Sequence, residues 1–68
     1  MKISARNILK GKIIDVVEGA TTAHVRIKVG NAVITASITN EAVAELGLKK
    51  DMSASAVIKS SDVMVAVD

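Results

Sequence analysis

Apolar and polar residues alternate with a period of two along three segments of the chain, which is the pattern of a half-buried β-strand. Residues 23–29 and 32–38 show it most clearly, and Gly30 and Asn31 separate them. This pair suits a tight hairpin turn because both residues tolerate positive φ. Residues 52–58 repeat the alternation with small Ala and Ser side chains. We therefore predict a hairpin of two strands and a later strand rich in small residues.

Two further segments are apolar but less regular. Residues 8–17 carry interspersed charges, and Gly11 interrupts them where a strand could bend or bulge. Residues 63–67 form a last short apolar segment, with the polar residues 59–62 before it. We predict a first strand and a fifth strand at these places.

The period changes after the third predicted strand. Thr39 or Asn40 can cap the start of a helix, Glu41 would lie in its first turn, and Gly47 would end it. A helix of about two turns is not stable alone in water and must dock against the sheet. The order of elements predicts an all-β fold, a five-stranded OB-like Greek-key barrel with one short helix between strands 3 and 4. With no repeat or linker, residues 1–68 are expected to form a single domain.

Composition predicts that the barrel is oligomeric. A chain of 68 residues without Cys can form only a marginal core, yet 50% of its residues are hydrophobic. His24 is the only His, so the chain cannot assemble a tetrahedral zinc cage. The remaining way to stabilise such a small fold is to bury the excess apolar surface between copies of the chain.

Several classes of partner and activity are disfavoured. The chain has no aromatic residue on which a base could stack, its net charge is only +2, and its basic residues form no run. We expect no nucleic-acid partner, although an OB-fold nucleic-acid-binding or scaffolding module stays the alternative. No apolar run approaches the ~20 residues of a membrane span, so we expect a cytoplasmic protein without a membrane partner.

Catalysis is also disfavoured, because the only His and the absence of Cys leave no nucleophile with an oriented base. We expect that the protein is not an enzyme and that it uses no organic cofactor.

Two polar segments near opposite ends of the chain contain the groups that hold a small oxyanion. Hydroxyl groups and backbone N–H groups donate hydrogen bonds, while Arg and Lys favour negative charge. The segments are Ser4, Ala5, Arg6 and Asn7, and Lys59, Ser60 and Ser61. Taken singly, the first segment is better explained as a solvated lead-in and the second as a polar turn, whose Asp62 would repel an anion unless it points away.

Together, these segments resemble the molbindins, small cytoplasmic molybdate-binding proteins made of one Mop domain. The resemblance rests on Ser4 to Asn7 followed by Ile8, Leu9, Lys10 and Gly11, and on Lys59 to Val63 after a strand. It covers essentially residues 1–68. It implies an OB-like barrel that assembles as a hexamer, a trimer of dimers, with oxyanions held at subunit interfaces. Storage and homeostasis of intracellular molybdenum are the implied role, and delivery to cofactor synthesis stays open.

The resemblance also implies the site residues. Ser4, Ala5, Arg6 and Asn7 of one subunit would face Lys59, Ser60 and Ser61 of another. The resemblance implies a second class of site near a threefold axis, and our candidate for it is residues 19–22, namely Gly19, Ala20, Thr21 and Thr22, together with His24. An ordinary exposed His on the polar face of a strand is the alternative for His24.

Molybdate is a tetrahedral dianion whose oxygens only accept hydrogen bonds, so its pocket must present donors. Tungstate has nearly the same shape and charge, and we expect it as a co-ligand. Sulfate is smaller, and monohydrogen phosphate needs an acceptor for its proton. The metal would be held as its oxyanion rather than by direct coordination.

Overall fold

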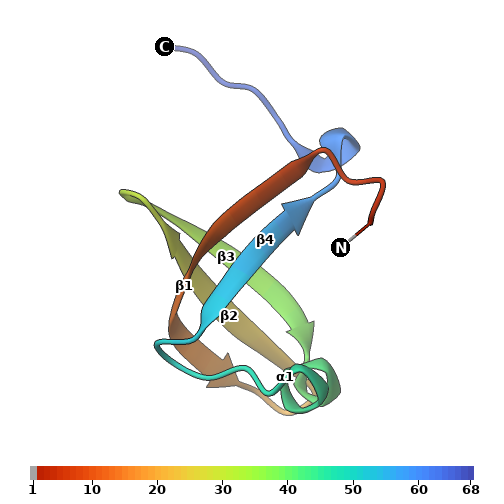
Figure 1. The fold of residues 1–68 in the computed structure, drawn as a ribbon, viewed down its shortest axis with the longest axis vertical. Helices are drawn as coiled ribbons and strands as arrows, with labels where there is room; N and C mark the ends of the chain where they lie inside the picture. The colour runs from red at the N-terminus through yellow and green to blue at the C-terminus, as the bar shows by residue number, and fades with distance from the viewer. Residues whose placement is uncertain (1) are drawn as a thin grey trace.

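The computed structural model of the protein describes residues 2–68, which form four antiparallel strands and a short helix (Figure 1). The sheet order is β3-β2-β1-β4, so β3 and β4 are its two edges. The elements in chain order are β1 (Asn7–Glu18), β2 (Thr22–Val29), β3 (Ala32–Thr39), α1 (Asn40–Leu46), β4 (Ser53–Ile58) and a 3-10 turn (Ser60–Asp62).

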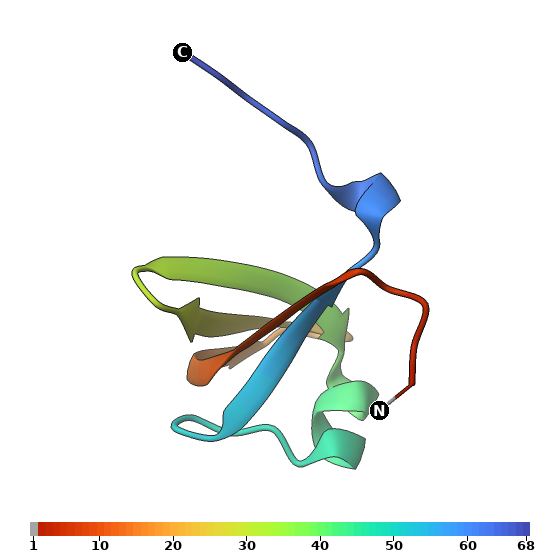
Figure 2. The same ribbon diagram turned by 45° about the horizontal axis from the view of Figure 1, so that its top comes forward.

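Strand β1 lies between β2 and β4 in the sheet and pairs with each of them over a different part of its length. Its first half, from Asn7 to Lys12, pairs with β4, and its second half, from Lys12 to Glu18, pairs with β2. A register shift between Ile13 and Asp15 adds a bulge, which increases the local twist of a strand. The sheet therefore curls until β4 crosses over β2 and β3, as Figures 1 and 2 show.

The core is small and consists of side chains on the inner face of this curled sheet and one side chain of α1. Alternate residues of β2 point inward, as the period of two predicted. The buried residues are Ile13, Ala23, Val25, Ile27, Val43 and Ala56. With so few buried side chains, the single chain leaves much of its apolar surface in contact with water.

The predicted turn and helix ends are confirmed. Gly30 has a φ of 59°, as the first central residue of a type II′ hairpin turn requires. Thr39 is the N-cap, and its side-chain oxygen accepts a hydrogen bond of 3.0 Å from the backbone N–H of Ala42. Gly47 ends α1 with a left-handed φ of 63°.

The predicted fifth strand is wrong for the single chain. Beyond the 3-10 turn, the C-terminal tail, residues 63–68, has no strand pairing and extends away from the sheet (Figures 1 and 2). Met64, Val65 and Val67 are 93%, 90% and 92% exposed. The turn redirects the chain, because the N–H groups of Asp62 and Val63 donate to the carbonyls of Lys59 and Ser60. The barrel therefore stays open between β3 and β4, with four strands instead of five.

Gly11 allows the close approach of β1 and β2 at the bend of the sheet. A Cβ at this position would overlap the carbonyl oxygen of Lys28 and lie 2.9 Å from a side-chain methyl of Ile27. Neither a backbone carbonyl nor a buried side chain can yield at low cost. Gly19 offers a milder comparison, since its added Cβ would lie 3.1 Å from the carbonyl oxygen of Thr22.

We expect Gly11→Ala to lower the free energy of unfolding by about 2–3 kcal/mol or more, the cost of overpacking at a backbone contact. Urea unfolding at a fixed protein concentration measures this change. Gly19→Ala is the control and should cost less. Equal unfolding midpoints of the Gly11→Ala variant and the parent chain would contradict the close crossing of the two strands.

Candidate functional site

The two polar segments meet at one end of the sheet, where β1 begins and β4 ends. Asn7 is paired with Ile58 in the strand register, so Arg6 lies just before and Lys59 just after the paired residues. The side-chain amide of Asn7 donates a hydrogen bond of 3.3 Å to the carbonyl oxygen of Ile58. Figure 1 shows the N-terminal segment next to the 3-10 turn. A single chain thus brings together the segments that the resemblance assigned to two subunits.

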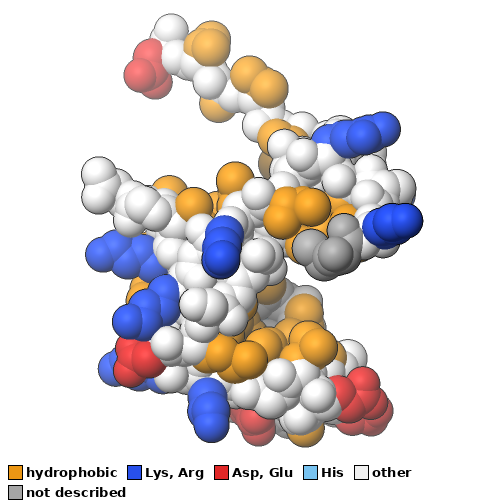
Figure 3. All heavy atoms as spheres, viewed as in Figure 1, with side chains coloured by type: hydrophobic (Ala, Val, Ile, Leu, Met, Phe, Trp, Pro, Cys, Tyr) orange, Lys and Arg blue, Asp and Glu red, His pale blue; other side chains and the backbone are white. Residues whose placement is uncertain are grey.

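In the part of the chain that the structure describes, neither Arg6 nor Lys59 of this β1–β4 junction forms a salt bridge. Among residues 2–68, the recorded salt bridge joins Arg26 and Asp15, with 2.8 Å between nitrogen and oxygen, and it lies elsewhere in the sheet. Arg6 and Lys59 are both exposed. Figure 3 shows Lys and Arg side chains at the upper right, over the N-terminal segment and the turn. Arg6 and Lys59 therefore place two cations at the junction, and Asp62 of the 3-10 turn is the carboxylate beside them.

The predicted site residues play different parts at the junction. Ser4, Ser60 and Ser61 are exposed, so their hydroxyl groups are accessible to a ligand. Asn7 is partly buried, and its amide already supports the end of β4. Ala5 is also partly buried and can offer a ligand only its backbone N–H.

The second predicted site lies at the other end of β1. Gly19, Thr22 and His24 line a hollow of about 250 Å³ together with Val17 and Glu18. The N–H of Gly19 donates to the carbonyl of Thr22 at 2.7 Å, so this donor is already used. The carboxylate of Glu18 opposes an anion in the same hollow.

The loop beside this hollow is tied to the helix. The backbone N–H of Asn40 donates to Thr21 at 2.9 Å, and its side-chain amide donates to Gly19 at 3.0 Å. Ala20 and Thr21 do not line the hollow. One chain therefore brings His24 close to only part of the predicted loop and adds no Arg or Lys to the hollow.

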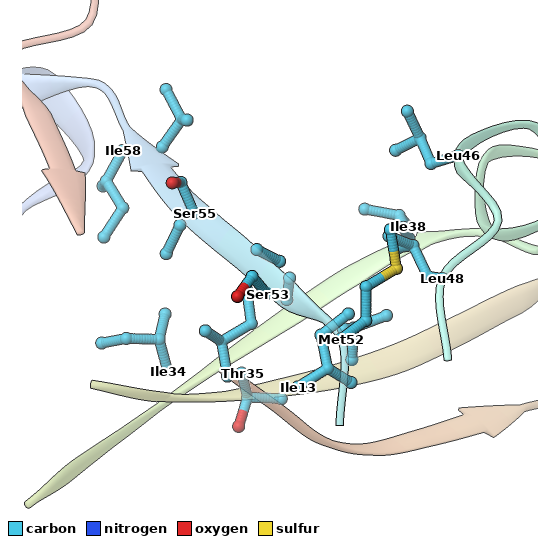
Figure 4. Close-up of a pocket in the computed structure, with 16 residues that line it drawn as sticks. Ile13, Ile34, Thr35, Ile38, Leu46, Leu48, Met52, Ser53, Ser55 and Ile58 are labelled. Carbon is cyan, nitrogen blue, oxygen red and sulfur yellow. The ribbon is translucent and has the colours of Figure 1, made fainter. Parts of the chain in front are cut away.

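An apolar groove between β3 and β4 was not predicted from the sequence. It has a volume of about 810 Å³ and is lined by inward-facing residues of both edge strands and by residues after α1. Figure 4 shows Ile34, Ile38, Leu48 and Met52 around this opening. The excess of hydrophobic residues was the available signal, but it did not show where the unburied surface would lie.

Within residues 2–68, no cluster of His, Asp or Glu side chains is arranged to hold a metal ion. No helix in the same range has the length and apolar character needed to cross a membrane.

Comparison with known proteins identifies the class to which this open barrel belongs. Residues 3–65 match the TOBE domain, and the chain belongs to this family. Molybdenum-pterin-binding protein 1 of Clostridium pasteurianum is 47% identical over 66 residues, which cover 96% of this chain and 97% of that protein.

Solved structures show the same relationship. A molybdate binding protein from Sporomusa ovata superposes with a TM-score of 0.94 at 30% identity, covering 98% of this chain and all of that one. The cytoplasmic molybdate-binding protein ModG, solved with molybdate bound, gives a TM-score of 0.89 at 49% identity, covering 94% of this chain and 46% of that chain. The predicted relation to small molybdate-binding proteins is confirmed.

Asn7 is expected to position the junction through its hydrogen bond to Ile58. Asn7→Ala removes this bond from a partly buried carbonyl and should lower the free energy of unfolding by about 0.5–1.5 kcal/mol. Amide hydrogen exchange of residues 59–62 should accelerate in the same variant. Ser4→Ala, which removes an exposed hydroxyl, is the control and should leave both measurements unchanged. Unaltered exchange in Asn7→Ala would show that the turn is held by other contacts.

Proposed function

We propose that this protein binds molybdate, and tungstate through the same contacts, to store molybdenum and to buffer its concentration in the cytoplasm. The observation that carries the proposal is the meeting of Arg6 and Lys59, neither of which forms a salt bridge within residues 2–68, at the β1–β4 junction. Relatives named for molybdenum or molybdate binding, which match almost the whole chain, support the choice of anion.

The chemistry of the junction suits a tetrahedral dianion. The guanidinium group of Arg6 can donate two parallel hydrogen bonds, and the ammonium group of Lys59 adds a point charge. Hydroxyl groups of Ser4, Ser60 and Ser61 supply neutral donors. Asn7 holds the two segments in register instead of contacting the ligand. This division of roles gives donors on several sides of the anion.

A second copy of the chain is needed to enclose the anion. The junction of one chain is exposed to water, and exposed charges interact weakly because solvent screens them. Enclosure between subunits would lower the local dielectric and strengthen each hydrogen bond to the anion. We therefore include in the proposal a hexamer, built as a trimer of dimers, with the anions at its interfaces.

The groove and the C-terminal tail support this assembly. The tail carries Val63, Val65 and Val67 on alternate positions, as in a strand with one apolar face. β4 has six residues, and the tail has the same length. The tail points away from its own sheet while the groove beside β4 stays open. The tail of a second copy is thus a suitable occupant, and it would complete the barrel with a fifth strand.

An exchange of C-terminal tails between two copies would link assembly to anion binding. The tail directly follows Lys59, Ser60 and Ser61 in the sequence. If it pairs antiparallel with β4 of the partner, these residues come close to the partner's own junction. Both copies would then contribute donors to one site, and an anion that binds only the assembly would stabilise it.

We expect molybdate and tungstate to bind more tightly than sulfate or phosphate in isothermal titration calorimetry. Arg6→Ala should weaken molybdate binding about tenfold or more, because a hydrogen bond to a charged group contributes ~1.5–3 kcal/mol. Ser61→Ala should weaken it less. Lys49→Ala, which removes an exposed cation far along the chain from both segments, is the control. Equal uptake of all four anions, or unchanged binding in both site variants, would refute the proposal.

A chain that ends at Asp62 should fail to form the hexamer, because it lacks the strand that fills the groove. Native mass spectrometry of the full and shortened chains, with and without molybdate, measures this. Asp68→Asn, at the tip of the tail, is the control and should assemble normally. A shortened chain that still assembles as a hexamer would show that the tails do not hold the copies together. The calorimetric titration would still test the anion site independently.

A further inference from the structure

The outer face of the sheet carries unpaired cations in neighbouring rows. Lys12 lies opposite Lys28 of β2 and, on its other side, opposite Ser53 of β4. Lys10 lies one row further along β1, opposite Ser55. Directly opposed residues of an antiparallel sheet share one face, and all five of these residues are exposed. The three lysines therefore form a cationic surface that reaches the β4 edge, where Ser53 and Ser55 also line the groove.

Among residues 2–68, none of these lysines forms a salt bridge, although Asp51, whose backbone N–H donates to Ile13 at 2.8 Å, lies near Lys12. Asp15 shares the face, but its side chain is paired with Arg26 at 2.8 Å. Like charges directly opposite each other destabilise a sheet, so the Lys12 and Lys28 pair brings no benefit to the isolated fold. Figure 3 shows several Lys and Arg side chains along the left side of the molecule, with an Asp or Glu side chain among them, and further Asp or Glu side chains at the lower end.

Exposed aliphatic side chains lie among these cations. Val33 is opposite Lys28 and is 48% exposed. Ile8 and Val57 are opposite each other in the row next to Lys10, and they are 44% and 40% exposed. These side chains would let a partner add apolar contacts to the charge complementarity that the lysines offer.

We propose that this outer face, which we call the lysine face, docks a protein partner that presents carboxylates beside apolar side chains. A second copy does not fit through the same face, since the lysines of both copies would oppose one another. Nucleic acid fits less well, because the chain has no aromatic residue for stacking and aliphatic side chains make poor contacts with phosphates. The proposal does not depend on the identity of the bound anion.

The three lysines lie in the middle of β1 and at the end of β2, and the pair of Ile8 and Val57 lies between them and the anion-suited junction at the start of β1. A partner could therefore dock without covering Lys59 or the serines of the 3-10 turn. Such a surface would let the protein hand over or receive its ligand in a complex, as well as store it.

The test uses the full chain and a synthetic 12-residue peptide of alternating Glu and Val, titrated while backbone amide shifts are followed by NMR. We expect the largest shifts at Lys12, Lys28 and Ser53. A Glu and Ser peptide of equal charge should bind more weakly, because it lacks the apolar contacts. Binding of the Glu and Val peptide should fall at least tenfold in Lys12→Glu/Lys28→Glu.

Lys49→Glu/Lys50→Glu makes the same change in net charge in the turn before β4, and it should lose less than threefold. Lys12→Glu alone creates an opposite-charge pair with Lys28, so it keeps the test valid if the double variant does not fold. If both double variants lose the same affinity for the Glu and Val peptide, binding depends only on net charge, and the proposal is overturned. Tighter binding of a 12-nucleotide single strand, or a changed oligomer mass in Lys12→Glu, would overturn it as well.

Discussion

The division of β1 between two partners is the constraint on which the rest of the structure depends. One strand of 12 residues pairs first with β4 and then with β2, and it can do so only because it bends between the two halves. Gly11 removes the side chain that would obstruct this bend. The same bend curls the sheet and brings its two edge strands, β3 and β4, to face each other without pairing. The junction lies where β1 begins and β4 ends. Fold, junction and groove thus have a common origin.

Local rules were sufficient for most of the elements. The period of two located β2, β3 and β4 to within a residue at each end, and the residues at the turn and helix ends behaved as their side chains predict. Thr39, rather than Asn40, is the cap, because its hydroxyl oxygen accepts the N–H of Ala42. Asn40 instead joins the loop before β2 to the helix. A choice between two adjacent capping residues depends on such contacts, which the sequence pattern does not contain.

The fifth strand shows where local rules end. Residues 63–67 have strand-forming side chains, but a strand also needs a neighbouring edge with which to pair. The 3-10 turn directs them away from the edge of β4 in their own chain. The candidate site shows the converse: nothing local relates Arg6 to Lys59, yet the pairing of Asn7 with Ile58 brings them together. The loop near His24 was assigned from resemblance, and the neighbouring Glu18 gives it a different electrostatic character.

The hydrogen bond between Asn7 and Ile58 joins residues that are 51 positions apart. During synthesis the first of them leaves the ribosome long before the second, and only the pairing of β1 with β4 unites them. A ligand that engages both segments therefore distinguishes a finished polypeptide from a nascent one.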